Sequence, residues 1–399
     1  MTTVGIVGAG IAGLHLGLAL RADGIPVTLY ADRSFDDLAA GPLLNTVAHH
    51  HPLLERERAL GVHHWPAAEF GYGAHHHWIG GIRFTGRFTH PSCAVDHRLY
   101  LPRLAEDLAE RGGRVEVRAV GPRDLGELAG RHDLLVVASG RGALSGLFPR
   151  RPEHSPHDAP RRLVCAGLYT GIAPAEPAAV TIGVAPGQGE LLEIPLLSRH
   201  GRVTALLFEN VPGGDLAVLN ELSPAADPAL FRKTVLEKLH EHHPATAERV
   251  LADFALTDPR DLLQGAVTPA VREDFLPLGD DKFALALGDA HVVVDPVMGQ
   301  GANIAAYSAA VVAAEIAAET VHDEVFCRRV ARAREEVLLG ASAWTNLMLD
   351  PPPWLGELWQ GLAEEPRKAD EFTDNFDHPD RQWRALATRR RVRAFLDGS

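Results

Sequence analysis

The chain has 399 residues, of which 46% are hydrophobic and 23% are charged, and its formal net charge at pH 7 is −13. This composition is typical of a folded globular protein and excludes a disordered or fibrous chain. The negative charge offers no electrostatic footprint for a nucleic-acid backbone or an anionic membrane surface. Three cysteines without a short CxxC spacing fit a reducing compartment, so we expect a cytoplasmic protein.

The first thirty residues predict a strand, a turn, a helix and a second strand. Residues 4–7 and 26–30 are apolar runs, and residues 14–21 follow helical spacing. The turn is Gly8-Ala9-Gly10-Ile11-Ala12-Gly13, whose glycines permit a tight turn, close approach to a pyrophosphate and helix-on-sheet packing. The helix N-terminus supplies free N–H groups to phosphates, and Asp32 lies where a carboxylate would take ribose hydroxyls. The sequence therefore predicts a dinucleotide site, the alternative being a glycine-rich structural turn.

The next polar residues follow the Leu43-Leu44 pair. Asn45, Val47 and His49 alternate, as residues on one face of a strand or extended loop do. An amide and an imidazole that reach one dry cavity could hydrogen-bond a reactive cofactor and suppress its loss to water. The alternative is a surface loop with incidental polar residues.

Histidines cluster at residues 49–51, 63–64 and 75–77, which suggests a metal site. Consecutive histidines in a strand point to opposite faces, however, and no carboxylate follows a metal-ligand pattern. We therefore expect no functional metal. Further along, residues 149–162 are rich in Pro, His and Arg and predict a crossover between sub-domains.

A second motif lies far along the chain. Residues 283–287 form an apolar strand that ends in Gly288-Asp289, and residues 295–303 (DPVMGQGAN) lead into an Ala/Val-rich helical stretch to about Thr320. This order resembles the second FAD fingerprint of the flavin hydroxylase fold, in which the Asp binds the ribityl chain and the helix N-terminus faces the flavin pyrimidine edge. A helix dipole there stabilises the negative charge that reduced flavin carries near N1 and O2. The alternative is an ordinary strand, loop and helix.

With both fingerprints placed, the chain from Val4 to about Trp383 resembles the oxygenase component of styrene and indole monooxygenases. The segments that carry the resemblance are GIVGAGIAGLHLGLAL, LLNTVAHH, EFGYG, AVDHRLY, GELLEIP, LGDAHVVVDPVMGQGAN and ADEFTDNFDHPDRQW. It implies an α/β fold like that of the aromatic hydroxylases, in which a Rossmann-type FAD-binding domain is interleaved with a β-sheet substrate domain and followed by a helical C-terminal part. It also implies a C4a-(hydro)peroxyflavin that transfers one oxygen atom to an electron-rich vinyl or indole double bond.

The expected domain boundaries follow from this resemblance. Residues 1–165 form the first part of the FAD-binding domain, with a substrate-domain insertion near residues 66–92. Residues 166–265 form the substrate domain, residues 266–320 the second part of the FAD-binding domain, and residues 321–399 a C-terminal helical region.

The resemblance also assigns site residues by position. The styrene branch of the family has a characteristic set around its pocket, and this chain matches it at Asn45, Val47, His49, Tyr72, His75 and Ser92. We expect Asn45 and His49 to be catalytic and the other four to bind the substrate. The expected FAD contacts are Gly8, Gly10, Ala12, Gly13, Asp32, Arg33, Arg98, Gly288, Asp289, Pro296, Gly299, Gln300, Gly301, Ala302 and Asn303. One departure is Pro42, where family members carry an Arg; the epoxide enantiomer that the family implies is (S).

The segment after the strand at residues 133–138 indicates where the reduced flavin comes from, because it lacks a carboxylate. Single-component aromatic hydroxylases carry an Asp-Gly fingerprint after the strand at residues 133–138, and this chain has Ser139-Gly140-Arg141-Gly142 there. We therefore expect reduced FAD to be supplied by a separate NADH-dependent flavin reductase, with O2 as co-substrate and a small aromatic alkene as substrate. The sequence leaves open whether the chain is a monomer or a homodimer.

Several alternative functions are compatible with both fingerprints. The chain could be an indole monooxygenase, or another external-flavin aromatic monooxygenase of a biosynthetic pathway. A geranylgeranyl-reductase-like or tRNA-modifying flavoprotein would be expected to show redox cysteines or a basic face, which this sequence lacks. A non-catalytic flavin-binding protein would be distinguished by its failure to convert any alkene.

Overall fold

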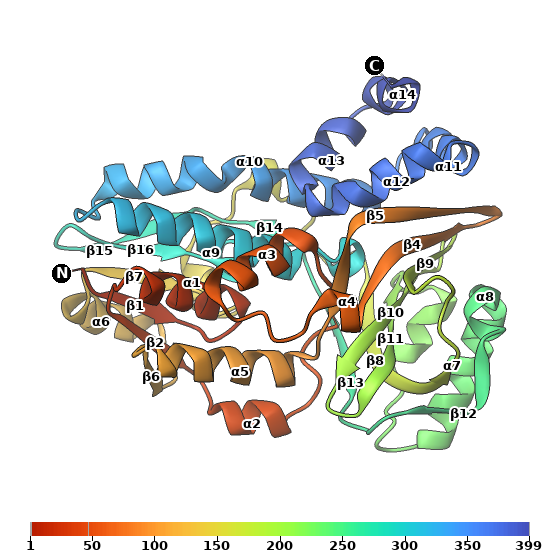
Figure 1. Cartoon of the computed structure of the whole chain (residues 1–399), viewed down its shortest axis with the longest axis horizontal. Helices are drawn as coiled ribbons and strands as arrows, with labels where there is room; N and C mark the ends of the chain where they lie inside the picture. Colours follow the sequence, from red (N-terminus) through yellow and green to blue (C-terminus); the bar gives the residue numbers. More distant parts are fainter. Residues whose placement is uncertain (1, 47, 399) are drawn as a thin grey trace.

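The computed structural model describes residues 2–46 and 48–398, which form two sheet-based halves side by side (Figure 1). A six-stranded sheet lies in the half that holds the N-terminus, and a nine-stranded sheet lies in the other half. The α/β fold that the sequence predicts, with two sheet-based halves and a helical C-terminal part, is confirmed.

The three central strands of the six-stranded sheet are short apolar runs that are almost entirely buried, as parallel strands need because helices cover both of their faces, whereas the outer strands are partly exposed. Its order is β15-β16-β7-β1-β2-β6, and only the β15–β16 pair is antiparallel. The strands are β1 (Val4–Val7), β2 (Val27–Ala31), β6 (Arg114–Val117), β7 (Leu134–Val137), β15 (Phe275–Gly279) and β16 (Lys282–Ala286). The strands from the start and from the last third of the chain thus meet in one sheet.

Helix α1 (Ile11–Ala22) packs between α5 (His97–Glu110) and α9 (Gly301–Ala318) on one face of this sheet. Helix α6 (Leu125–Arg131) covers the opposite face. Helix α9 is long and apolar enough to cross a membrane by length and composition, but half of it is buried inside the protein, as in a core helix. The shorter helices of the first hundred residues are α2 (Phe35–Ala40), α3 (His51–Leu60) and α4 (Ala67–Phe70).

The nine-stranded sheet has the order β12-β8-β11-β10-β9-β4-β5-β3, with β13 also paired to β8. Its strands are β3 (Ala48–His49), β4 (Gly71–Ile79), β5 (Ile82–Ala94), β8 (Leu163–Ile172), β9 (Ala179–Ala185), β10 (Gly189–Ser198), β11 (Gly201–Asn210), β12 (Val250–Leu256) and β13 (Leu262–Ala266). Both faces are buried: α7 (Pro228–His242) and α8 (Pro244–Ala247) cover one, and C-terminal helices cover the other. The predicted insertion near residues 66–92 coincides with β4 and β5, and the short strand β3 pairs with β5 at the edge of this sheet, whereas α3 packs against α9.

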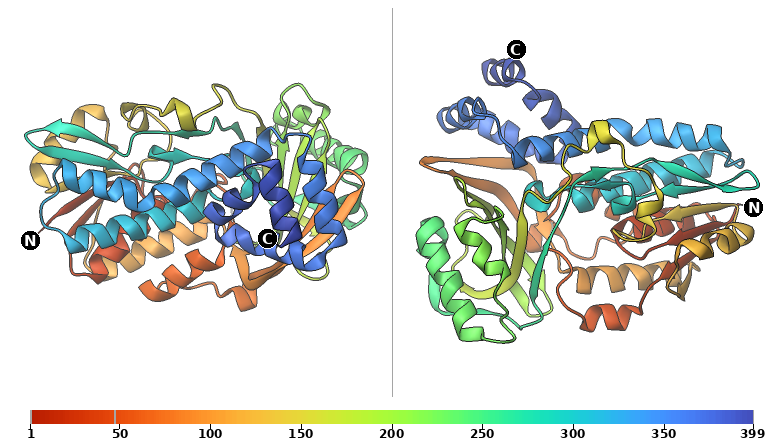
Figure 2. Two further views of the ribbon diagram at one scale, coloured as in Figure 1. Left: turned by 90° about the horizontal axis from the view of Figure 1, so that it is seen from above. Right: turned by 180° about the vertical axis from the view of Figure 1, so that it is seen from behind.

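The C-terminal helices are α10 (Glu324–Leu349), α11 (Leu355–Glu364), α12 (Pro366–Asp374), α13 (Pro379–Leu386) and α14 (Arg389–Asp397). Helix α10 lies along α9, and the helices that follow extend over the long strands β4 and β5 (Figures 1 and 2). Helix α12 approaches β5 closely at Gly86, where an added Cβ would come within 2.2 Å of the Ala369 carbonyl oxygen. This contact places the last part of the chain against the substrate-domain sheet.

Candidate active site

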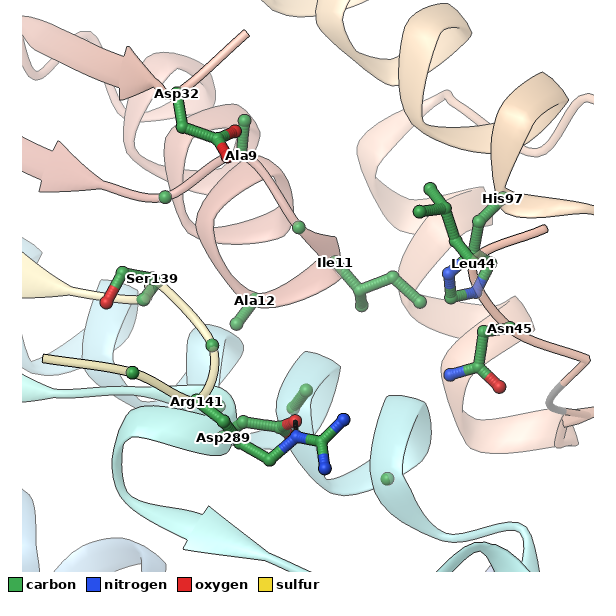
Figure 3. Close-up of a pocket in the computed structure, with 18 of the residues that line it drawn as sticks. Ala9, Ile11, Ala12, Asp32, Leu44, Asn45, His97, Ser139, Arg141 and Asp289 are labelled. Atoms are coloured by element: carbon green, nitrogen blue, oxygen red, sulfur yellow. Dashed lines mark ion pairs between the residues drawn. The ribbon is translucent and has the colours of Figure 1, made fainter. Parts of the chain in front are cut away.

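A cavity of about 650 Å³ runs along the carboxyl ends of β1, β2 and β7 and reaches the nine-stranded sheet. Ligands of open α/β sheets bind at this edge. Figure 3 shows Ala9 and Asp32 at one end of the cavity and Leu44, Asn45 and His97 at the other. The cavity is therefore elongated, as a dinucleotide requires.

The glycine turn lines the cavity, and each of its three glycines is required for a different reason. Gly8 has φ +117°, and an added Cβ would lie 2.2 Å from the Ala138 carbonyl oxygen. A Cβ on Gly13 would lie 2.0 Å from the Gly8 carbonyl oxygen, so Gly13 permits α1 to pack on the turn. A Cβ on Gly10 would meet no atom within 4 Å, because Gly10 faces the cavity. Gly10 is also the N-cap of α1, so the free N–H groups of its first turn begin there.

Asp32 and Arg33 lie at one end of this cavity, directly after β2. Arg33 Nη2 donates to Asp32 Oδ2 at 3.0 Å, and the two side chains are 50% and 67% exposed. The Asp32 carboxylate can therefore still accept hydrogen bonds from a ligand. The segment at residues 139–142 forms the adjacent wall.

The second motif forms the wall opposite the glycine turn. Six of its predicted residues line the cavity, and they are Gly288, Asp289, Pro296, Gly299, Gly301 and Ala302. Asp289 has a half-exposed side chain whose Oδ2 lies 3.9 Å from Arg141 Nε. The first turn of α9 thus supplies its N-terminus to the cavity, as the sequence predicts.

Gln300 and Asn303 do not line the cavity. Gln300 Nε2 donates to the Phe376 carbonyl at 3.2 Å. The Asn303 side chain accepts from the His50 N–H at 2.9 Å and donates to the Ala48 carbonyl at 2.9 Å. Both amides therefore bind protein backbone, and their predicted cofactor contacts need this correction.

The predicted cofactor contact of Arg98 also needs correction. This residue was expected to contact the cofactor, but its side chain is 1% exposed and lies away from the cavity. Its guanidinium binds Asp96 Oδ2 at 2.6 Å and Asp261 Oδ1 at 2.6 Å. Arg98 therefore joins α5 to the loop between β12 and β13 through a buried ion-pair network.

A smaller, mostly apolar cavity adjoins the first one. Three residues line both cavities: Asn45, Pro296 and Gly299. The remaining lining residues of the smaller cavity are Thr46, Ala48, His50, Tyr72, His75, Val180, Ile182, Leu192, Ile194, Leu207, Val297, Met298 and Phe376. Asn45 Oδ1 accepts from the Thr46 N–H at 2.7 Å, so its side-chain NH₂ is the group available to a ligand.

The predicted substrate residues are only partly brought together here. Tyr72 and His75 line the smaller cavity, and Ser92 lies behind it, 3.1 Å from His50 Nδ1. Val47 lies outside the described residues.

His49 does not reach either cavity. It is fully buried, its Nδ1 lies 3.6 Å from Glu57 Oε1, and its ring packs against Tyr100 at 4.6 Å. The expectation that Asn45 and His49 share one face is wrong, because regular strand covers only residues 48–49 and His50 faces the cavity instead.

Three residues that the sequence interpretation missed complete the walls. His50 and Phe376 line the smaller cavity, and His97 lines the larger one beside Asn45 (Figure 3). Phe376 lies in the segment ADEFTDNFDHPDRQW, which carried the resemblance without an assigned role, so a signal for it existed. His97 likewise lies in a segment that carried the resemblance, AVDHRLY, and had no assigned role.

Burial keeps the imidazoles of the site neutral at neutral pH. It lowers the pKa of His50 and of His97 to about 3 and holds the pKa of His75 well below its usual value. Burial also raises the pKa of the Tyr72 phenol. The smaller cavity therefore presents uncharged groups, which suits an apolar ligand.

Comparison with known proteins gives consistent results. The family model described as "Styrene monooxygenase A putative substrate binding domain" matches residues 140–249. The chain is 45% identical to styrene monooxygenase StyA of Pseudomonas fluorescens, covering 98% of this chain and 96% of that protein, and 46% identical to StyA of a Pseudomonas species, with the same coverage.

The solved structures share the fold at low sequence identity. The flavin-dependent brominase Bmp2 superposes with a TM-score of 0.71 at 16% identity, covering 100% of this chain and 99% of that one. The oxygenase of 2-methyl-3-hydroxypyridine-5-carboxylic acid superposes with a TM-score of 0.60 at 14% identity, covering 96% and 99%. These structural similarities support the fold, whereas the sequence relatives at 45–46% identity show the family.

Proposed function

Because the chain belongs to the styrene monooxygenase family, we propose that it is the oxygenase of a two-component enzyme that epoxidises styrene-like aryl alkenes. In this proposal the cofactor is FAD, supplied in reduced form by a separate NADH-dependent flavin reductase in the cytoplasm, and O2 is the co-substrate. The observation that carries the proposal is the wall that the two cavities share. A group bound in the larger cavity meets a molecule in the smaller one at Asn45, Pro296 and Gly299.

The larger cavity supports FAD by the chemistry of its lining. The N–H groups that follow Gly10 suit the pyrophosphate, and Asp32 suits the ribose hydroxyls at the outer end. Asp289 and the N-terminus of α9 suit the ribityl chain and the negatively charged edge of the reduced ring. Reduced flavin supplies the activation of O2; the protein positions it and keeps water away.

The smaller cavity supports an aryl alkene. Five larger aliphatic side chains of the nine-stranded sheet line it, and Phe376 closes it from the C-terminal part; the five are Val180, Ile182, Leu192, Ile194 and Leu207. The aromatic rings of His75 and Phe376 pack edge-to-face with centroids 4.6 Å apart, which makes a rigid wall. Such a pocket binds by shape and burial rather than by charge.

We assign two roles at the junction. Asn45 is a catalytic residue in the proposal, because its NH₂ group faces the place where cofactor and substrate meet. His49 is a positioning residue: its ring lies 6.1 Å from the ring of His97, which lines the larger cavity. Glu57 holds the His49 and Tyr100 rings in place, since its carboxylate lies 3.6 Å from His49 Nδ1 and accepts a hydrogen bond from the Tyr100 hydroxyl at 2.6 Å.

The external supply of reduced flavin is supported by the wall at residues 139–142. This segment lines the larger cavity with Ser139 and Arg141 where a carboxylate fingerprint would serve the nicotinamide cofactor. No second GxGxxG motif follows a strand-like run elsewhere in the sequence. The reduced cofactor would then arrive from the partner reductase.

The proposal is tested by reconstitution. Purified protein, FAD, NADH and a small flavin reductase are mixed with styrene in air, and styrene oxide is measured by chiral gas chromatography. We expect styrene oxide only when the reductase and this protein are both present, with the (S) enantiomer in excess. Indole in a parallel reaction distinguishes the alternative: faster turnover of indole would assign the chain to indole oxidation, and no turnover of either would refute the proposal.

A further inference from the structure

Three carboxyl groups and one guanidinium lie near the wall that the two cavities share, and Glu190 and Glu209 are register partners on neighbouring strands. Glu190 lies on β10, Glu209 lies on β11, and Asp295 directly precedes Pro296. Glu209 and Asp295 are completely buried, and Glu190 and Arg162 are each 7% exposed. Water therefore contributes little to the stabilisation of these charges.

The Arg162 guanidinium forms an ion pair with Glu190. Its Nε donates to Glu190 Oε2 at 2.6 Å and its Nη2 donates to Oε1 at 2.8 Å, which is a bidentate ion pair. Its Nη1 donates to the Arg161 carbonyl, and its Nη2 also donates to the Leu349 carbonyl. The guanidinium charge is thus balanced by Glu190, and Glu209 and Asp295 need another source of stabilisation.

Glu209 and Asp295 lack the partners that ionised carboxylates require. Within the described residues, neither oxygen of Glu209 has a hydrogen-bond partner, and the same is true of Asp295 Oδ2. Asp295 Oδ1 accepts from the Val297 N–H at 3.1 Å. A buried carboxylate without partners takes up a proton instead of remaining charged.

Electrostatics agrees with this geometry. Burial, followed by the negative charge of Asp295, holds the pKa of Glu209 well above its usual value. Burial raises the pKa of Asp295 to about 7. The titratable groups that face the pair are Glu190 from β10, which raises both values, and Arg162 ahead of β8, which lowers them.

The pair lies next to both cavities. Val164, the register partner of Glu209 on β8, lines the larger cavity, and Leu207, two residues along β11, lines the smaller one. Pro296, which follows Asp295, lines both. The charge of the pair therefore acts on the end of the larger cavity where α9 begins.

We propose that Glu209 and Asp295 hold one proton between them and that this proton sets the affinity of the larger cavity for negatively charged reduced flavin. With the proton retained, the pair carries one negative charge; without it, two buried negative charges repel the reduced ring. The oxidised ring is neutral and does not experience this repulsion. Binding of reduced flavin therefore strengthens the hold of the pair on its proton. The inference rests on the flavin site of the proposed function.

The test compares reduced with oxidised FAD under anaerobic conditions. Affinities are measured between pH 6 and 9 for the wild-type protein and for Glu209→Gln, which has the shape of protonated Glu209 and cannot ionise. We expect the dissociation constant for reduced FAD to rise with pH more steeply in the wild type, by up to about tenfold per pH unit. The difference between the two proteins is diagnostic, because the protonation of the free flavin is the same in both.

Controls and proton counting complete the design. Glu193→Gln removes a carboxyl that is also buried on β10 but pairs with Arg249 on the opposite face of the sheet, and it should keep the wild-type pH profile. Calorimetry in buffers of different ionisation enthalpy should show more proton uptake with reduced than with oxidised FAD, approaching one proton. Asp295→Asn, which removes the other carboxyl, should flatten the profile as well.

The outcomes separate the two proposals. If wild type and Glu209→Gln bind FAD with parallel pH profiles, the proton-holding pair is refuted while the flavin site stands. If neither redox state of FAD binds the wild type, the flavin site is refuted and this inference with it.

Discussion

Replacement of Gly10 by valine should abolish cofactor binding and leave the fold intact. Gly10 has φ −80° and ψ −173°, which any L-residue adopts, and its added Cβ would meet no protein atom within 4 Å. Glycine is only a moderately good N-cap, so the loss of folding stability should stay within about 1 kcal/mol. The valine methyl groups would instead occupy the space where the pyrophosphate approaches α1.

The magnitude follows from the hydrogen bonds that the ligand would lose. Hydrogen bonds between backbone N–H groups and a charged phosphate contribute roughly 1.5–3 kcal/mol each. Displacement of the pyrophosphate from two N–H groups would therefore cost about 3–6 kcal/mol, which is roughly a 10²- to 10⁴-fold rise in the dissociation constant.

The assay measures FAD affinity by isothermal titration calorimetry and folding by thermal denaturation. Gly13→Val is the matched control, because its Cβ would lie 2.0 Å from the Gly8 carbonyl oxygen and must distort the turn. Gly13→Val should lose both stability and binding, whereas Gly10→Val should lose binding alone. Undiminished FAD affinity in folded Gly10→Val would refute the assignment of the cavity to the cofactor.

Four further predictions concern the chemistry and the buried charges. Asn45→Ala should form less styrene oxide and more hydrogen peroxide per NADH consumed, as measured by gas chromatography and a peroxidase assay, since an unpositioned oxygen donor decays before it meets the alkene. Anaerobic stopped-flow mixing of the FAD-loaded protein with NADH should show no flavin reduction within about 0.1 s, the turnover time of a median enzyme, until a reductase is added. Arg98→Met should destabilise the fold by about 3–5 kcal/mol in urea titrations, because it leaves Asp96 buried without its cation. Burial raises the pKa of Asp295 to about 7, so its contribution to stability is fully present below its unfolded pKa near 4 and is lost as pH rises through about 7; the wild type should therefore lose stability relative to Asp295→Asn across that range, as measured by urea titrations.

The sequence predicts this fold well wherever the pattern is local. The apolar run at residues 4–7 is β1, the glycine turn leads into α1, and the second motif leads into α9, as expected. These elements depend on hydrophobic periodicity and on glycine, both of which are visible in a short window. The meeting of the two motifs at one cavity follows from the parallel sheet, whose carboxyl ends share one edge.

The misplaced residues depend on contacts that no short window contains. Arg98 binds Asp261, 163 positions away, and nothing near Arg98 in the sequence indicates that partner. His49 was assigned to the cavity because strand alternation was extended back to Asn45. A shift of one residue turns every side chain to the other face, and here it brings His50 to the cavity.

The side-chain amides of Gln300 and Asn303, which were expected to contact flavin, connect the linings of the two cavities. Asn303 ties the first turn of α9 to the backbone on both sides of His49, and Gln300 ties the same turn to Phe376. The first turn of α9, which lines the larger cavity, is therefore bonded directly to two segments that line the smaller one. The hydrogen bonds of Asn303 and Gln300 thus join the lining of the larger cavity to the lining of the smaller one.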